Sequence, residues 1–140
     1  MRYHYLNNLS DELINQINES LNKEFVNIEP KDLAKSNSIA IIATENNHLA
    51  GYTILSRRKT CYYIVWIVTL PAYRGRGIAR NIMRHAMRMH NCLTLFVEPN
   101  TIAEQLYTKL GFKRTGKYRD LPDDRNQLRR MYHMRWKAQN

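Results

Sequence analysis

One stretch of the chain, residues 62–80, constrains the fold more than any other. It begins with an apolar run, Tyr62–Val68, whose β-branched and aromatic residues are typical of a strand buried on both faces. The run is followed by the sequence R-G-R-G, after which a helix is predicted. A helix N-terminus offers unpaired N–H groups and a positive dipole end, and Gly75 and Gly77 let the backbone come close to an anion. The stretch therefore predicts a site for a phosphorylated ligand.

Length and composition indicate one ordered globular domain, residues 1–140, with 44% hydrophobic and 10% aromatic residues. A membrane helix needs about 18 continuous apolar residues, and no stretch of the sequence approaches that length. The first eight residues, MRYHYLNN, lack the apolar core of a signal peptide. We therefore expect a soluble cytoplasmic protein that does not enter a membrane.

Two cysteines, Cys61 and Cys92, are far apart in sequence, and each lies in or beside an apolar run. In a cytoplasmic protein this pattern predicts two separate buried thiols. No Cys/His spacing typical of a zinc site occurs, so no bound metal is expected.

The formal net charge of +10 indicates attraction to polyanions, such as nucleic acid, phosphorylated cofactors or acidic proteins. Lysines and arginines are concentrated in residues 113–137. A solvated basic face is the favoured interpretation of this segment, and a nucleic-acid surface is the alternative.

Hydrophobic periodicity predicts an α/β fold, in which a mixed, mostly antiparallel sheet is flanked by helices. Strands 62–68 and 93–97 are joined through a helix and are expected to be parallel. The predicted elements are strand 2–6, a helix from Ser10, a short helix from Pro30, strands 38–44, 49–55 and 62–68, a helix from Ile78 to Asn91, strand 93–97, a helix from Thr101 to Gly111, and strands 112–118 and 131–136.

Both later helices have apolar stripes that are predicted to face a core. The stripe of the first comprises Ile78, Ile82, Ala86 and Met89, and that of the second comprises Ile102, Leu106 and Leu110. Thr101 and Glu104 have the spacing of a capping box at the start of the second helix, and Asn100 is the alternative cap.

Three motifs in this order resemble those of the Gcn5-related N-acetyltransferase (GNAT) superfamily. They are P-x-Y-R-G-x-G-I-A at 71–79, E-x-N at 98–100 and A-x-x-L-Y-x-x-L-G-F at 103–112. The resemblance covers residues 36–137 by order of elements. It implies that the parallel strands splay apart and leave an edge of strand 62–68 free for a cofactor.

The resemblance implies acetyl-coenzyme A (acetyl-CoA) as the acetyl donor and a primary amine as the acceptor. Backbone N–H groups of the glycine turn would hold the pyrophosphate, and the end of strand 62–68 would pair with the pantetheine arm. The cofactor-binding positions that it implies are Ile67, Val68, Thr69, Arg74, Gly75, Arg76, Gly77, Ile78, Ala79, Asn100, Ala103 and Tyr107.

Tyr107 matches the tyrosine that acts as general acid toward the leaving thiolate in this family. The glutamate that many members carry on the preceding strand is missing, because no Asp, Glu or His occurs in residues 49–84. Glu98 or a water relay is favoured as the general base; His133 and an amine that is already neutral are the alternatives.

The motifs do not specify the acceptor. The basic charge is compatible with an acidic acceptor or with a nucleic-acid acceptor such as aminoacyl-tRNA. A basic module that binds coenzyme A or nucleic acid without turnover is the non-enzymatic alternative. Both a monomer and a homodimer are compatible with the sequence.

Overall fold

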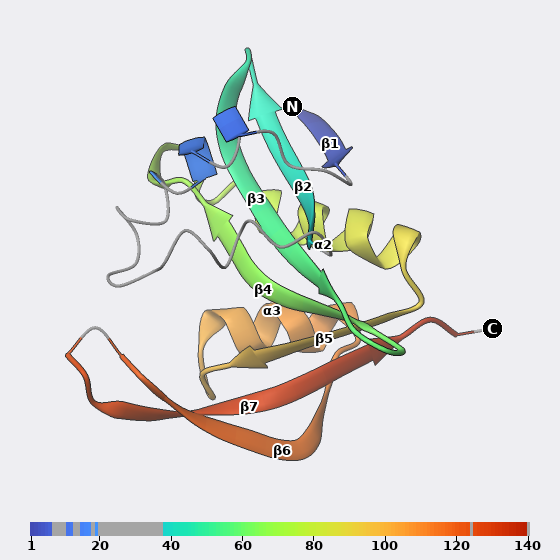
Figure 1. The fold of residues 1–140 in the computed structure, drawn as a ribbon, viewed down its shortest axis with the longest axis vertical. Helices are drawn as coiled ribbons and strands as arrows, with labels where there is room; N and C mark the ends of the chain where they lie inside the picture. Colours follow the sequence, from blue (N-terminus) through green and yellow to red (C-terminus); the bar gives the residue numbers. More distant parts are fainter. Residues whose placement is uncertain (7–10, 13–14, 18, 20–37, 124, 140) are drawn as a thin grey trace.

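The computed structural model describes residues 1–6, 11–12, 15–17, 19, 38–123 and 125–139 (Figure 1). Of the helix expected from Ser10, residues 11–12, 15–17 and 19 are described and all of them are helical, whereas the helix expected from Pro30 lies entirely outside the described residues. Among the described residues, no helix is both long enough and apolar enough to cross a membrane.

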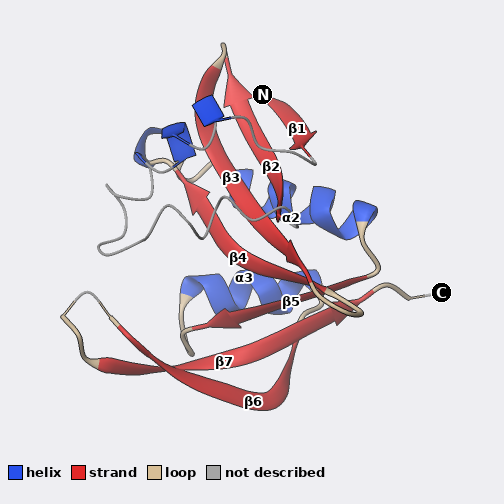
Figure 2. Cartoon of the chain, in the orientation of Figure 1, coloured by secondary structure: helices blue, strands red, loops and turns tan. Residues whose placement is uncertain are grey.

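The described strands form one seven-stranded sheet in the order β1-β2-β3-β4-β5-β7-β6. Figure 2 shows these strands in red, with the helices α2 and α3 in blue. The elements are β1 (Arg2–Leu6), β2 (Ser38–Glu45), β3 (His48–Arg57), β4 (Tyr62–Thr69), the 3-10 helix η2 (Pro71–Tyr73), α2 (Ile78–Met89), β5 (Cys92–Val97), α3 (Ile102–Leu110), β6 (Lys113–Pro122) and β7 (Leu128–Lys137).

The antiparallel succession of β2, β3 and β4 is as the sequence predicts, and the structure adds the pairing of the remaining strands. Strands β1 to β4 are antiparallel to one another in succession, and β7 lies antiparallel between β5 and β6. The β2–β3 hairpin turns through Asn46 and Asn47, which have φ values of 51° and 64°, and asparagine tolerates this left-handed region well. Among the described strands, β4 and β5 form the one parallel pair, so the predicted mixed sheet is confirmed.

The main core lies between one face of the sheet and the helices α2 and α3. Helix α2 buries Ile78, Ile82, Met83 and Ala86. The expectation for Met89 was wrong, because 55% of this residue is exposed. Met89 is the last residue of the helix, and Met83, nearly two turns earlier, completes the buried face instead.

Gly51 on β3 lets the first turn of α2 lie close to the sheet. A Cβ atom at this position would lie 2.8 Å from the backbone oxygen of Val68 and 3.1 Å from Cγ2 of Ile78. Both separations are shorter than ordinary van der Waals contact, so only glycine fits without a shift of its neighbours. The close approach fixes the helix N-terminus beside the end of β4.

The expectation of two separate buried thiols was also wrong. Cys61 and Cys92 form a disulfide, with their Cα atoms 4.6 Å apart. Because β4 and β5 are parallel neighbours, residues at their starts lie at the same end of the sheet, although the two cysteines are 31 positions apart in sequence. The bond ties the two strands together at the end where they pair.

This disulfide generates a stability prediction. Closing a loop of 31 residues restricts the unfolded chain and contributes about 3.7 kcal/mol to the free energy of unfolding by chain entropy, the upper part of the usual range. Replacing both cysteines, Cys61→Ser with Cys92→Ser, should lower that free energy by about 2–4 kcal/mol in urea titrations.

A reductant should destabilise the unsubstituted protein by a similar amount and should leave the double variant unaffected. Equal stability of the protein with and without reductant would contradict the prediction.

Candidate cofactor slot and acceptor face

Strands β4 and β5 pair for only a short distance. Their parallel pairing is limited to Tyr62 with Leu93 and Tyr63 with Thr94, although β4 continues to Thr69. Figure 1 shows the two strands diverging beyond this point. The rest of β4 is still paired with β3 on its other edge, and no strand among the described residues pairs with its β5-facing edge. An extended ligand could bind this edge as an added strand.

The predicted pantetheine positions Ile67, Val68 and Thr69 lie in this unpaired part of β4. Their Cα partners on β3 are Thr53, Tyr52 and Gly51. These three positions therefore lie along the part of β4 that does not pair with β5, and their contact with a cofactor stays a prediction.

The glycine turn follows at the end of β4. Gly75 and Gly77 have φ values of 82° and 76°, the left-handed region that favours glycine. Gly77 is the N-cap of α2 and offers no side-chain cap, so the first N–H groups of the helix have no capping oxygen. A Cβ atom at either glycine would meet nothing within 4 Å. The turn thus presents N–H groups to open space.

Two arginines border the same turn. The Arg74 side chain donates from Nε to the backbone oxygen of Thr69, 3.2 Å away. Arg76 forms an ion pair with Glu45, with Nη1 and Oε2 2.9 Å apart, and lies over the ring of Tyr73. No acidic residue occupies the first turn of α2, so the local charge favours an anion.

A hollow of about 510 Å³ lies in front of the turn. It brings together seven of the predicted cofactor positions with two residues of α3. The lining comprises Thr69, Arg74, Gly75, Arg76, Gly77, Ile78, Ala79, Arg80, Ile102 and Leu106.

The expectation that Ile102 faces a core was wrong. Ile102 is the first residue of α3, is 85% exposed, and lines the hollow with Leu106. Sequence reasoning missed both residues as parts of the site. Their i, i+4 spacing was the available signal, but the same spacing is typical of a buried stripe.

Tyr107 is one residue beyond Leu106 on α3 and belongs to the main core, with 6% of the residue exposed. Its ring centroid lies 5.8 Å from that of Phe112. Within the described part of the chain its hydroxyl has no hydrogen-bond partner. Burial raises the pKa of Tyr107 to about 12, because a phenolate would lose its solvation. The side chain is therefore a neutral phenol throughout the physiological pH range.

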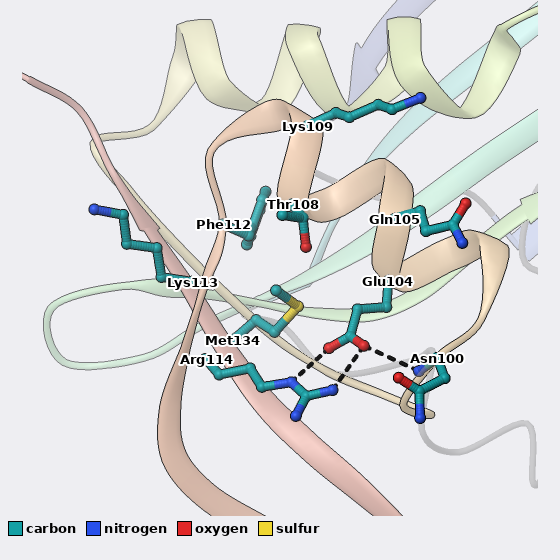
Figure 3. A pocket seen from close by; sticks show the side chains of 9 residues that line it. All are labelled: Asn100, Glu104, Gln105, Thr108, Lys109, Phe112, Lys113, Arg114 and Met134. Carbon is teal, nitrogen blue, oxygen red and sulfur yellow. Dashed lines mark hydrogen bonds and ion pairs between the residues drawn. The ribbon is translucent and has the colours of Figure 1, made fainter.

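The turn between β5 and α3 is held by a small polar network (Figure 3). Thr101 caps α3 by accepting from the Glu104 N–H at 3.2 Å, which confirms the predicted cap. The Glu104 carboxylate accepts from the Asn100 N–H at 3.0 Å and from two nitrogens of Arg114, each at 2.7 Å. The hydrogen bond from Arg114 is the main cause that lowers the pKa of Glu104. The network joins the start of α3 to β6.

A second cavity, of about 720 Å³, lies beside this network. Figure 3 shows the side chains that line it. It extends over α3, β6 and β7, with the buried side chains of Phe112 and Met134 among its lining. Asn100 lines this cavity rather than the hollow in front of the glycine turn. Ala103 is exposed and lines neither. The structure therefore does not bring these two predicted positions to the phosphate end of the site.

The two predicted bases occupy different environments. Glu98 is exposed and forms an ion pair with Arg129, with Oε1 and Nη1 3.3 Å apart. His133 is half-buried on β7, and its Nδ1 lies 2.7 Å from the Thr115 hydroxyl. Burial, followed by the charges of neighbouring cations, lowers the pKa of His133. Among the described residues, no group of three or more His, Cys, Asp or Glu side chains could hold a metal ion.

Comparisons with known proteins agree with this geometry. A family profile described as an acetyltransferase (GNAT) domain matches residues 36–114. N-alpha-acetyltransferase RimI of Mycobacterium tuberculosis is 30% identical over 93 residues, which are 61% of this chain and 59% of that protein. The match thus spans less than two thirds of the relative.

Solved structures show the same fold at low sequence identity. The ribosomal-protein-S18-alanine N-acetyltransferase of Escherichia coli is 17% identical with a TM-score of 0.79, covering 97% of this chain and 94% of that chain. Arabidopsis thaliana NAA60 with a bisubstrate analogue is 12% identical with a TM-score of 0.77, covering 99% and 100%. The aminoglycoside 6'-N-acetyltransferase of Enterococcus faecium is 15% identical with a TM-score of 0.73, covering 98% and 97%. Because the family profile covers more than half of the sequence, the chain belongs to the GNAT family of acetyltransferases.

Proposed function

We propose that the chain is an N-acetyltransferase that moves the acetyl group of acetyl-CoA to a primary amine. The observation that carries the proposal is the free edge of β4, which leads directly into the hollow at the N-terminus of α2. This arrangement offers an extended polar arm a strand partner and offers the attached phosphates a set of backbone N–H groups.

Each part of the site has a role in the proposal. Residues Gly75 to Ala79 hold the pyrophosphate, while Arg74 and Arg76 add positive charge. The pantetheine arm lies along Ile67–Thr69 and points its thioester toward the place where β4 and β5 part. The family resemblance implies that Asn100 contacts the pantetheine arm and that Ala103 is a small residue beside the cofactor, and the proposal keeps both roles.

The reaction transfers the acyl group in one direct attack. The acceptor nitrogen bonds to the thioester carbonyl carbon, the carbon–sulfur bond breaks, and the electron pair of that bond goes to sulfur. The amine gives up one proton, and the coenzyme A sulfur finally takes one up. Atoms and charges therefore balance without another reactant.

Tyr107 serves as the donor to the leaving sulfur in this proposal. A thiol has a pKa of about 8.5, so complete proton transfer from a phenol of pKa about 12 costs about 5 kcal/mol. That cost favours a hydrogen bond that strengthens as charge develops on sulfur, over the formation of a buried phenolate. The coenzyme A sulfur then takes up a proton from water when solvent enters the site.

The lack of a carboxylate on β4 affects which kind of amine can serve as the acceptor. At pH 7 about 14% of a peptide α-amine with pKa near 7.8 is neutral, against less than about 0.1% of a lysine side chain. An α-amine thus needs much less help from a base, and Glu98 or His133 with a water molecule could take its proton. We propose an α-amine as acceptor, and the name of the RimI relative, an N-alpha-acetyltransferase, supports this choice.

The alternatives predict different behaviour. A module that binds coenzyme A or nucleic acid without turnover would release no free thiol with any amine. Acetylation of aminoacyl-tRNA would require that nucleic acid as acceptor. The cytoplasmic location and the oligomeric state remain predictions from the sequence.

Gly77→Ala tests the phosphate cradle. Alanine in the left-handed region costs about 1–2 kcal/mol in the free energy of unfolding, and its Cβ enters the space in front of the turn. Loss of even one charge-assisted hydrogen bond should weaken binding of coenzyme A about tenfold by calorimetry.

Gly116→Ala is the matched control, because Gly116 on β6 has φ of 92° and equally open space around it. It should cost similar stability without changing the affinity for coenzyme A. Equal affinity losses in both variants would remove the assignment of the cradle.

Tyr107→Phe tests the donor to sulfur. The substitution should lower kcat about a hundredfold or more, because the leaving sulfur loses its hydrogen bond, while the Kd for acetyl-CoA stays within about twofold. Thiol release in steady-state assays measures the first quantity, and calorimetry measures the second.

Tyr118→Phe serves as the control, since Tyr118 is exposed on β6, where it stacks with Arg130. Unchanged turnover in the Tyr107 variant would refute its role in catalysis.

A further inference from the structure

A row of aromatic rings crosses three neighbouring strands on the sheet face opposite α2 and α3. Tyr63 of β4 meets Phe96 of β5 edge to face, with centroids 6.2 Å apart, and Phe96 meets His133 of β7 in the same way at 5.0 Å. The alternation of β5 directs Leu93, Leu95 and Val97 into the core beneath the helices, and therefore turns Phe96 to the other face.

Two guanidinium groups lie over this row. Arg119 of β6 is 4.5 Å from the centroid of Phe96, and Arg58 is 5.2 Å from that of Tyr63. We call these five residues, Arg58, Tyr63, Phe96, Arg119 and His133, the acceptor patch. A guanidinium that stacks on a ring keeps its N–H donors free at its edge, in the geometry that binds carboxylates.

The patch is strongly cationic. Lys117 and Arg135 join Arg119 in lowering the pKa of His133, after burial, so all three charges lie near that ring. In the described part of the chain, no acidic residue forms an ion pair with any of these cations or with Arg58. Two described acids of the same hairpin pair with other arginines: Asp120 with Arg130, and Asp123 with Arg129.

The position of the patch connects it to the cofactor slot. Tyr63 is the last β4 residue that pairs with β5, and Phe96 lies two residues beyond Thr94, where the strands have begun to part. The opposite face of this region is closed by the core, which includes Leu95, Val97 and Tyr107. An acceptor can therefore approach a thioester in the slot from the side of the patch.

We propose that the acceptor patch binds the acceptor and selects a peptide N-terminus whose first residues include aspartate or glutamate. The inference rests on the proposed function and adds the class of acceptor to it. Peptide carboxylates meet the edges of Arg58 and Arg119, while the α-amine reaches between β4 and β5.

The ring contacts favour a peptide over a nucleic acid. Proteins that bind single-stranded nucleic acid stack the nucleobases on free aromatic faces. Here guanidinium groups already lie over Tyr63 and Phe96, and the rings meet one another by their edges. The donors left available suit carboxylates better than they suit stacked bases.

The test compares three peptides of equal length that begin with alanine and continue with acidic, neutral or basic residues. Their kcat/KM values, measured by thiol release, should fall in that order, by about tenfold from acidic to neutral. Raising the salt concentration to 0.5 M should compress the difference, because the contacts are partly exposed charges.

Arg119→Gln, alone and combined with Arg58→Gln, should reduce the ratio of the acidic to the neutral rate toward one. Calorimetry with acetyl-CoA checks that these variants keep a folded cofactor site. Arg130→Gln is the matched control, because Arg130 lies on the same hairpin but pairs with Asp120 and stacks on Tyr118. It should preserve the preference for the acidic peptide.

The outcomes separate this inference from the proposed function. Equal kcat/KM values for the three peptides, or a higher value for the basic peptide, would overturn the acceptor patch but would leave the proposed acetyltransferase activity intact. Inhibition by single-stranded RNA that Arg119→Gln relieves, without preference among peptides, identifies a nucleic-acid surface and also overturns it. If no amine is acetylated, the proposed function fails. Binding of the acidic peptide that Arg119→Gln weakens would then still support the acceptor patch. Absence of any binding of the acidic peptide would refute the patch.

Discussion

The parting of two parallel strands is the constraint on which the rest of the structure depends. β4 and β5 keep two residue pairs together, and the Cys61–Cys92 bond holds them at that end. Beyond it, each strand remains paired on its outer edge, β4 with β3 and β5 with β7, so the sheet stays whole while a slot opens inside it. The free N–H and C=O groups of such a slot need a partner, and an extended amide-bearing arm supplies one.

The slot has two chemically different sides. On the helix side, Tyr107 lies in the apolar core with a pKa raised to about 12, and the first turn of α2 presents N–H groups. On the other side, Phe96 and His133 lie among arginines and lysines. In the proposed reaction, a neutral donor to the leaving sulfur would thus lie on one side and a cationic surface for the acceptor on the other. We propose that the acceptor amine approaches the thioester carbonyl carbon from the cationic side, while Tyr107 contacts the leaving sulfur from the helix side.

Local patterns in the sequence predicted most of what positions the cofactor site. The strand 62–68, the glycine turn and the Thr101 cap depend on neighbours within a few residues, so their residue types were sufficient. Several features that depend on contacts between distant segments were missed, although the parallel pairing of β4 with β5 was predicted. The disulfide and the aromatic row depend on the register of neighbouring strands, and the exposure of Ile102 depends on where the first residue of α3 lies. Helical or strand periodicity does not contain that information.

The central claim is that the cofactor occupies the slot between β4 and β5, and amide hydrogen exchange with and without acetyl-CoA tests it most directly. We expect new protection of amides in residues 64–69 and 75–80, where the free strand edge and the α2 N-terminus lie. Unchanged exchange in both segments, or protection confined to the cavity beside Glu104 and Arg114, would contradict the account.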